Sequence, residues 1–99
     1  MTPRTVTVLG STGSIGRQTL EVIQQQSKDF SVVALAAGSN ADVLAQQAHI
    51  FKPKFVAIAD ERAYRALKDQ VQGAKVEAGM DAVIEAARMD ADITMAAIV

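Results

Sequence analysis

The amino-acid sequence predicts an α/β fold, a doubly wound parallel sheet with helices on both faces. Two observations support this fold class. Short apolar segments alternate with segments of helical periodicity over the 99 residues of the chain, which is typical of parallel α/β sheets. The first apolar segment also passes through three glycines, spaced three apart, directly into a helical pattern; these are Gly10, Gly13 and Gly16.

Strands and helices alternate in the prediction, which begins and ends with a strand. In order, the predicted elements are a strand at 5–9, a helix at 14–26, a strand at 31–37, a helix after Asn40, a strand at 55–59, a helix after Asp60, a short strand at 74–77, a helix that carries residues 80–87 and a strand at 93–99. Asn40 and Asp60 are good N-caps, and Pro53 ends the second helix. The strand at 31–37 is a continuous apolar run, as expected of a strand covered by helices on both faces.

Apolar residues at helical spacing predict which side of each helix lies on the sheet. The predicted inward residues are Leu20 and Ile23 in the first helix, Leu44, Ala48 and Phe51 in the second, Ala63, Leu67 and Val71 in the third, and Met80, Val83, Ile84 and Ala87 in the fourth. Gly16 shares a face with Leu20 and Ile23, so we expect it to let the first helix pack closely. The last strand ends at Val99 without a covering element, and we interpret residues 1–99 as the N-terminal part of a domain of a longer protein.

Composition and charge argue against several classes of protein. Ten basic and eleven acidic side chains give a net charge of −1, and only three phenylalanines and one tyrosine are present, so we expect no nucleic-acid binding. The absence of cysteine excludes disulfides and thiolate metal sites and fits a cytoplasmic protein. No apolar run approaches the roughly 20 residues that span a bilayer. Too few residues precede the first strand for a signal peptide.

The segment VTVLGSTGSIG, residues 6–16, predicts a phosphate site where a strand turns into a helix. The first turn of a helix has N–H groups without internal partners and lies at the positive end of the helix dipole, so it attracts anions. Glycine allows the tight turn, the approach of a pyrophosphate and the packing of helix on strand. The spacing G-x-x-G-x-x-G is a variant of the G-x-G-x-x-G fingerprint of Rossmann-like dinucleotide-binding domains. A plain turn without a ligand is the alternative.

The end of the second strand bears on the choice of cofactor. NAD-binding domains commonly hold an acid about 20 residues after the last glycine, where it binds the ribose 2′-hydroxyl. The corresponding residues here are Ala36, Ala37 and Gly38, and none is acidic. This permits NADP, with Ser39, Asn40 and Arg17 as candidate donors to its 2′-phosphate. Alternatively, Gly38 only bends the chain and Asn40 only caps the next helix.

Other polar residues are better explained without chemistry. His49 is interpreted as a partly exposed structural histidine. Asp90 and Asp92 precede the last strand and so belong to a solvated loop at the N-terminal edge of the sheet, whereas ligands of open α/β sheets gather at the carboxyl ends. Asp60 is interpreted as a helix cap. We therefore assign no catalytic residue and no metal ligand within residues 1–99.

The segment VLGSTGSIGRQTLEVI, residues 8–23, closely resembles the N-terminal cofactor motif of the 1-deoxy-D-xylulose 5-phosphate reductoisomerase family. The resemblance continues through residues 30–40, returns at 51–54 and at 95–99, and so covers nearly all of the chain. Residues 64–92 are its least diagnostic part.

This resemblance implies an NADPH-dependent oxidoreductase of the methylerythritol phosphate route to isoprenoids. Such an enzyme converts 1-deoxy-D-xylulose 5-phosphate, a phosphorylated sugar, to 2-C-methyl-D-erythritol 4-phosphate, uses magnesium, manganese or cobalt, and is typically a homodimer. The NADPH contacts that the resemblance implies are Thr12, Gly13, Ser14, Ile15, Gly38, Ser39 and Asn40. Many members have lysine where this chain has Ser39. The metal-binding and substrate-binding residues of the family would lie beyond Val99, so residues 1–99 alone are predicted to be inactive.

Two other classes of function remain open on the sequence. One is a different NADP-dependent reductase with the same glycine spacing, such as an aspartate-semialdehyde dehydrogenase or a dihydrodipicolinate reductase. The other is a non-catalytic nucleotide-binding domain.

Overall fold

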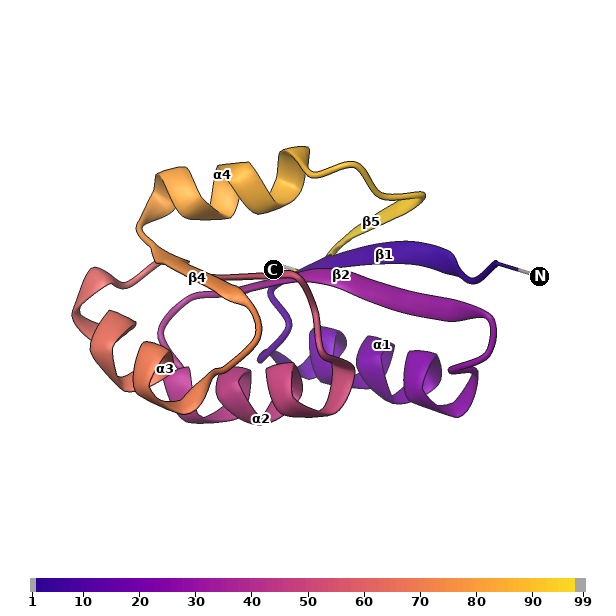
Figure 1. Ribbon diagram of the computed structural model, residues 1–99, viewed down its shortest axis with the longest axis horizontal. Helices are drawn as coiled ribbons and strands as arrows, with labels where there is room; N and C mark the ends of the chain where they lie inside the picture. Colours follow the sequence, from indigo (N-terminus) through magenta and orange to yellow (C-terminus); the bar gives the residue numbers. More distant parts are fainter. Residues whose placement is uncertain (1, 98–99) are drawn as a thin grey trace.

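The computed structural model describes residues 2–97, which form a five-stranded parallel sheet with helices on both faces (Figure 1). The elements are β1 (Arg4–Leu9), α1 (Ser14–Gln25), β2 (Phe30–Ala37), α2 (Ala41–Phe51), β3 (Phe55–Ile58), the 3-10 turn η1 (Glu61–Ala63), α3 (Tyr64–Gln70), β4 (Lys75–Ala78), α4 (Met80–Arg88) and β5 (Ile93–Ala96). The predicted α/β class, doubly wound with a parallel sheet, is confirmed.

The order of strands across the sheet is β4-β3-β2-β1-β5. The chain moves outward from β1 to β4, and α4 then carries it back across the sheet so that β5 pairs with β1, from Val6↔Ile93 to Leu9↔Ala96. In Figure 1, α4 covers one face of the sheet, and α1, α2 and α3 cover the other. The order in which successive strands are added to the sheet therefore reverses at β1. In such sheets, ligands bind beyond the carboxyl ends of the strands at this switch point.

Each face of the sheet has its own apolar core. The larger core lies between the sheet and α1, α2 and α3, and its most deeply buried residues include Val8, Leu35, Leu44, Val56, Ile58 and Leu67. The smaller core, under α4, consists largely of alanines, among them Ala34, Ala36, Ala57, Ala82 and Ala86. Small side chains on both partners allow α4 to lie close to the strands.

The predicted inward face of the fourth helix is wrong by one position. Ala82 and Ala86 are buried in α4, whereas Met80 is 62% exposed and Ile84 is 43% exposed. Ala87 is also exposed, and only Val83 of the predicted set packs against the smaller core. The strands beneath this helix present alanines, so the helix approaches them with its own smallest side chains. The prediction from hydrophobicity alone placed the larger side chains of Met80 and Ile84 on the inward face.

The other predictions for the elements differ from the structure only at their ends. The third predicted helix begins as η1 and continues as α3, with Leu67 and Val71 buried as expected. Of the last predicted strand, 93–99, the structure shows β5, and residues 98 and 99 lie outside the described residues. No helix within residues 2–97 combines the length and the hydropathy needed to cross a membrane.

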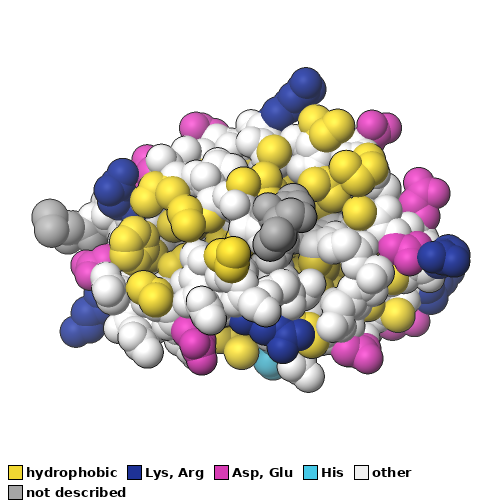
Figure 2. Space-filling view, turned by 180° about the vertical axis from the view of Figure 1, so that it is seen from behind, with side chains coloured by type: hydrophobic (Ala, Val, Ile, Leu, Met, Phe, Trp, Pro, Cys, Tyr) yellow, Lys and Arg dark blue, Asp and Glu magenta, His cyan; other side chains and the backbone are white. Residues whose placement is uncertain are grey.

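The surface is not uniformly polar. Figure 2 shows apolar side chains across the middle of one face, with charged side chains mainly around its margin. The large apolar side chains that are exposed include Ile15, Val22, Ile50, Met80, Ile84 and Met95.

Candidate functional site

The turn from β1 into α1 depends on two different properties of glycine. Gly10 has a φ of 81°, a left-handed conformation that glycine adopts without strain. Its N–H and that of Ser11 both donate to the carbonyl oxygen of Ala36, at 2.7 and 3.0 Å, which fastens the turn to β2. At Gly16, a Cβ atom would lie 2.1 Å from the carbonyl oxygen of Gly10. The close packing predicted for Gly16 is therefore confirmed.

Gly13 is different, because the fold itself has room for a side chain there. Its φ is −78°, and an added Cβ would meet only the carbonyl oxygen of Gly10, at 3.7 Å. Gly13 is the N-cap of α1 and makes no side-chain cap, and the first turn contains no acidic residue. The N-terminus of α1 thus offers its N–H groups and the positive end of its dipole without a competing side chain.

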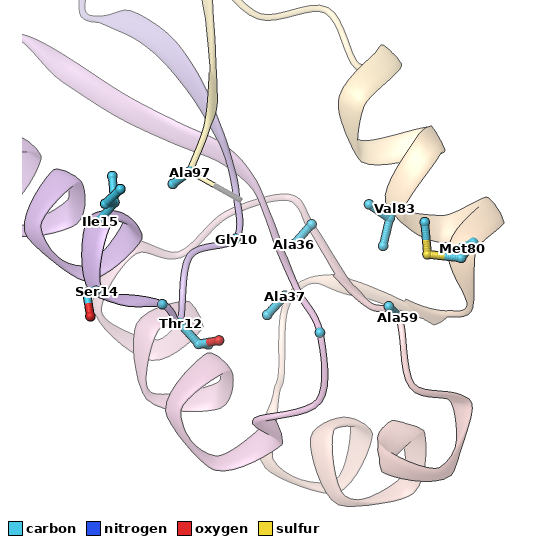
Figure 3. Close-up of a pocket in the computed structure, with 12 residues that line it drawn as sticks. Gly10, Thr12, Ser14, Ile15, Ala36, Ala37, Ala59, Met80, Val83 and Ala97 are labelled. Carbon is cyan, nitrogen blue, oxygen red and sulfur yellow. The ribbon is translucent and has the colours of Figure 1, made fainter. Parts of the chain in front are cut away.

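A cavity of about 480 Å³ lies over the carboxyl ends of the strands (Figure 3). The glycine turn, residues 12–15, forms one side of the cavity. The last residues of β2, with Gly38 after them, form its floor, and Ala59, Met80 and Val83 lie opposite the turn. Its lining is made of glycine, alanine, hydroxyl and apolar side chains and includes no acid. This composition suits a ligand with an anionic part at the turn and an apolar ring beside α4.

The structure brings most of the predicted site residues together. Thr12, Gly13, Ser14, Ile15 and Gly38 line this cavity. Ser39 and Asn40 follow Gly38 and are exposed, but they are not part of the cavity lining.

Asn40 has the capping role that the sequence predicts. Its Oδ1 atom accepts a hydrogen bond from the Val43 N–H at 3.2 Å. The cap uses the amide oxygen, so within residues 2–97 the side-chain N–H groups remain available as donors. The side chain of Arg17, the third candidate donor, bonds through Nε to the carbonyl oxygen of Thr12 at 2.8 Å.

An acidic residue does lie near the end of β2, although it comes from the segment that follows β3 and precedes η1. The Asp60 N–H donates to the carbonyl oxygen of Gly38 at 2.8 Å. Its carboxylate caps η1 and is bound by the Arg62 guanidinium, with Nε–Oδ1 at 3.1 Å and Nη2–Oδ2 at 3.2 Å. The hydrogen bonds from Arg62 lower the pKa of Asp60 below its ordinary value. The negative charge of Asp60 is thus compensated by the arginine two residues further on.

Two other polar residues to which the sequence assigned no chemistry, His49 and Asp92, lie away from the cavity. His49 is exposed on α2. Asp92 lies at the N-terminal edge of the sheet, where its Oδ2 accepts from the Thr5 N–H at 2.8 Å and from Thr5 Oγ1 at 3.2 Å. Asp92 therefore ties the start of β5 to that of β1. Residues 2–97 contain no group of three or more potential metal ligands.

Gln47 contacts the glycine turn from the interior, outside the cavity lining, and the sequence analysis missed it. Its Nε2 donates to the carbonyl oxygen of Ser11 at 2.8 Å, and the bond is buried. A signal was present, because Gln47 is a polar residue on the apolar face that carries Leu44 and Phe51.

Three features define a Rossmann-like dinucleotide-binding domain. They are a parallel sheet whose strand order reverses at β1, a glycine turn into α1, and a cavity over the carboxyl ends of the strands. The family model of 1-deoxy-D-xylulose 5-phosphate reductoisomerase matches residues 6–99. The chain belongs to this family.

Individual relatives agree with the family match. The 1-deoxy-D-xylulose 5-phosphate reductoisomerase of Zymomonas mobilis is 50% identical over 99 residues, which cover 98% of this chain and 26% of that protein. The solved structure of the Zymomonas mobilis enzyme in complex with NADPH matches with a TM-score of 0.95 at 46% identity, covering 98% of this chain and 26% of that one. A DOX-P reductoisomerase in complex with NADPH, fosmidomycin and magnesium matches with a TM-score of 0.88 at 30% identity, over 96% of this chain and 24% of that one. The chain thus spans about a quarter of the length of the relatives that it matches.

Proposed function

We propose that this chain supplies the NADPH-binding part of a 1-deoxy-D-xylulose 5-phosphate reductoisomerase, which forms 2-C-methyl-D-erythritol 4-phosphate in isoprenoid biosynthesis. The observation that carries the proposal is the glycine turn of the family motif, which opens onto the uncapped N-terminus of α1 beside a cavity with no acidic lining. The NADPH complex of the relative with a TM-score of 0.95 supports it.

The pyrophosphate would lie over Thr12, Gly13, Ser14 and Ile15. The first N–H groups of α1 have no internal acceptor, and the helix dipole adds a favourable partial charge. The hydroxyls of Thr12 and Ser14 are further donors. Gly13 would allow the phosphate to approach the backbone, since the protein itself leaves space at this position.

The 2′-phosphate would lie beside Gly38, Ser39 and Asn40. Ala36 and Ala37 leave no carboxylate at the end of β2, so no charge on this strand repels the phosphate. The exposed amide of Asn40 and the hydroxyl of Ser39 would donate hydrogen bonds to it. Because a serine replaces the lysine found in many members, we expect a preference for NADPH over NADH on the order of 1–3 kcal/mol, the range of charge-assisted hydrogen bonds.

The remaining chemistry belongs to parts of the protein outside this chain. NADPH, when bound, supplies a hydride to the reaction. We infer that the divalent metal of the family, magnesium, manganese or cobalt, is held by residues beyond Val99. Two of the matching structures contain magnesium, which supports a metal-dependent reaction. We further propose that the whole protein is a homodimer and is cytoplasmic.

Replacing Gly13 by valine tests the position of the pyrophosphate. In the full-length enzyme, Gly13→Val should weaken NADPH binding at least tenfold, about 1.4 kcal/mol, because the side chain would occupy the space needed by the phosphate. Dissociation constants are measured by calorimetry. The thermal unfolding midpoint serves as the control that the variant folds, since the added Cβ itself meets only one atom, at 3.7 Å. Unchanged affinity in a folded variant would contradict this position.

A further inference from the structure

Gln47 connects α2 to the glycine turn through the interior of the protein. Its side chain is only 8% exposed, and that of Ser11 is fully buried. The bond from Gln47 Nε2 to the carbonyl oxygen of Ser11, 2.8 Å long, joins residues 36 positions apart. A buried hydrogen bond between side chain and backbone holds a peptide group more firmly than an exposed one, because water does not compete for the carbonyl.

This bond determines the orientation of the peptide between Ser11 and Thr12. The peptide is trans, so the carbonyl of Ser11 and the N–H of Thr12 point to opposite sides of the chain. With the carbonyl held toward α2, the Thr12 N–H lies on the side away from α2. Because Thr12 belongs to the cavity wall, we expect this N–H to face a ligand there.

A second side chain holds the next carbonyl. The Nε atom of Arg17 donates to the carbonyl oxygen of Thr12 at 2.8 Å. Two successive carbonyl oxygens of the turn are thus engaged by side-chain donors. A carbonyl oxygen facing the cavity would repel a phosphate, so both contacts favour a turn that presents N–H groups. Arg17 is exposed, whereas Gln47 is buried.

We propose that Gln47 is a positioning residue of the dinucleotide site, which holds the Ser11–Thr12 peptide in the orientation that receives the pyrophosphate. The proposal rests on the proposed function of the turn as a pyrophosphate site. Without the amide of Gln47, no other donor within residues 2–97 reaches the Ser11 carbonyl in the interior. It recovers a hydrogen bond by rotating toward water in the cavity, where its oxygen opposes the phosphate.

Methionine is the substitution of choice, because it has a similar length and no N–H donor. In the full-length enzyme, Gln47→Met should raise the dissociation constants of NADPH and NADH about tenfold. Both should rise by the same factor, since the two cofactors share the pyrophosphate and differ in the 2′-phosphate. The KM for NADPH should rise while kcat at saturating NADPH stays within about twofold. Gln46→Met is the matched control, since Gln46 is the exposed neighbour on α2, and it should leave both constants unchanged.

The result separates positioning from a purely structural role. If Gln47→Met lowers the unfolding midpoint but leaves both dissociation constants unchanged, Gln47 only stabilises the fold and the proposal is wrong. An effect on NADPH alone would also overturn it. Should Gln47→Met fail to fold, Gln47→Leu, which is also apolar and has no N–H donor, is judged by the same criteria. Failure of the unsubstituted enzyme to bind NADPH would instead refute the proposed function itself.

Discussion

Gly13 and Gly16 are the second and third glycines of one motif, but glycine is needed at the two positions for different reasons. At Gly16 the reason lies in the protein itself, because a Cβ would meet backbone atoms at 2.1 and 2.7 Å. At Gly13 no described atom comes closer than 3.7 Å to such a Cβ. The space at Gly13 is therefore available to a ligand, which is the reason for choosing this residue to test the pyrophosphate site.

The choice of cofactor is best tested at Gly38. An added Cβ there meets nothing within 4 Å, whereas Ala37 is 4% exposed and belongs to the larger core. Gly38→Asp should therefore place a carboxylate at the cavity without disturbing the fold. We expect NADPH binding to weaken at least tenfold, about 1.4 kcal/mol, and NADH binding to stay equal or improve, because only the 2′-phosphate is repelled.

Gly38→Asn is the control for this experiment, since asparagine has nearly the same size and no charge. Dissociation constants for both cofactors are measured in the full-length enzyme and in each variant. If the aspartate variant keeps its affinity for NADPH, or if the asparagine variant loses as much, the 2′-phosphate does not lie beside Gly38.

At the scale of the elements, the packing of α4 on the sheet depends on small side chains. The helix covers its face of the sheet with Ala82 and Ala86, which pack against alanines of β2 and β3. Alanines on both partners let the helix lie close to the sheet, and Leu9, Val33 and Phe55 complete this core. Protein interiors are close-packed, so a larger side chain at Ala82 or Ala86 must displace its neighbours. The helix also carries Met80 and Val83 to the cavity, so its distance from the sheet affects the shape of the site.

Enlarging the inner face of α4 should therefore destabilise the protein. Ala86 is fully buried, and Ala86→Leu should lower the free energy of unfolding by about 1–3 kcal/mol, the usual cost of overpacking. Ala87→Leu is the control, because Ala87 is the exposed neighbour on the same helix. Urea unfolding of both variants compares them. If the two variants have equal free energies of unfolding, Ala86 does not pack between α4 and the sheet.

At the scale of the whole molecule, the chain holds the proposed nucleotide site but no residue to which we assign catalysis. It corresponds to about a quarter of the relatives that it matches. The matching structures that contain magnesium or fosmidomycin are those of much longer chains. We therefore expect the residues that bind metal and substrate to lie elsewhere in the full-length protein.

Residues 1–99 by themselves should be inactive. A purified protein of these residues, supplied with 1-deoxy-D-xylulose 5-phosphate, NADPH and magnesium, should oxidise no NADPH above the rate without protein. The full-length enzyme is the positive control in the same assay, which follows the oxidation of the reduced nicotinamide. Substrate-dependent turnover by residues 1–99 would mean that this chain contains the catalytic groups.

Much of the fold could be predicted because it depends on local chemistry. The alternation of apolar and helical segments identified every strand and helix to within a few residues, and the glycine turn located the candidate site. Asn40 and Asp60 were recognised as caps from residue type and position, and both cap as expected. The face of α4 could not be predicted, since it depends on how large the side chains of β2 and β3 are beneath it.

The sequence by itself determined the class of fold, the position of the glycine turn proposed to bind phosphate, the close packing at Gly16 and the absence of an acid at the end of β2. Periodicity, glycine geometry and capping act over a few residues, so they can be recognised without knowing the fold. Only the tertiary structure decided that β5 lies beside β1, that Gly38 rather than Ala37 has room for a side chain, and that Gln47 holds the carbonyl of Ser11. These features join segments far apart in the chain, and their energies depend on distances and burial that exist only after the sheet has formed.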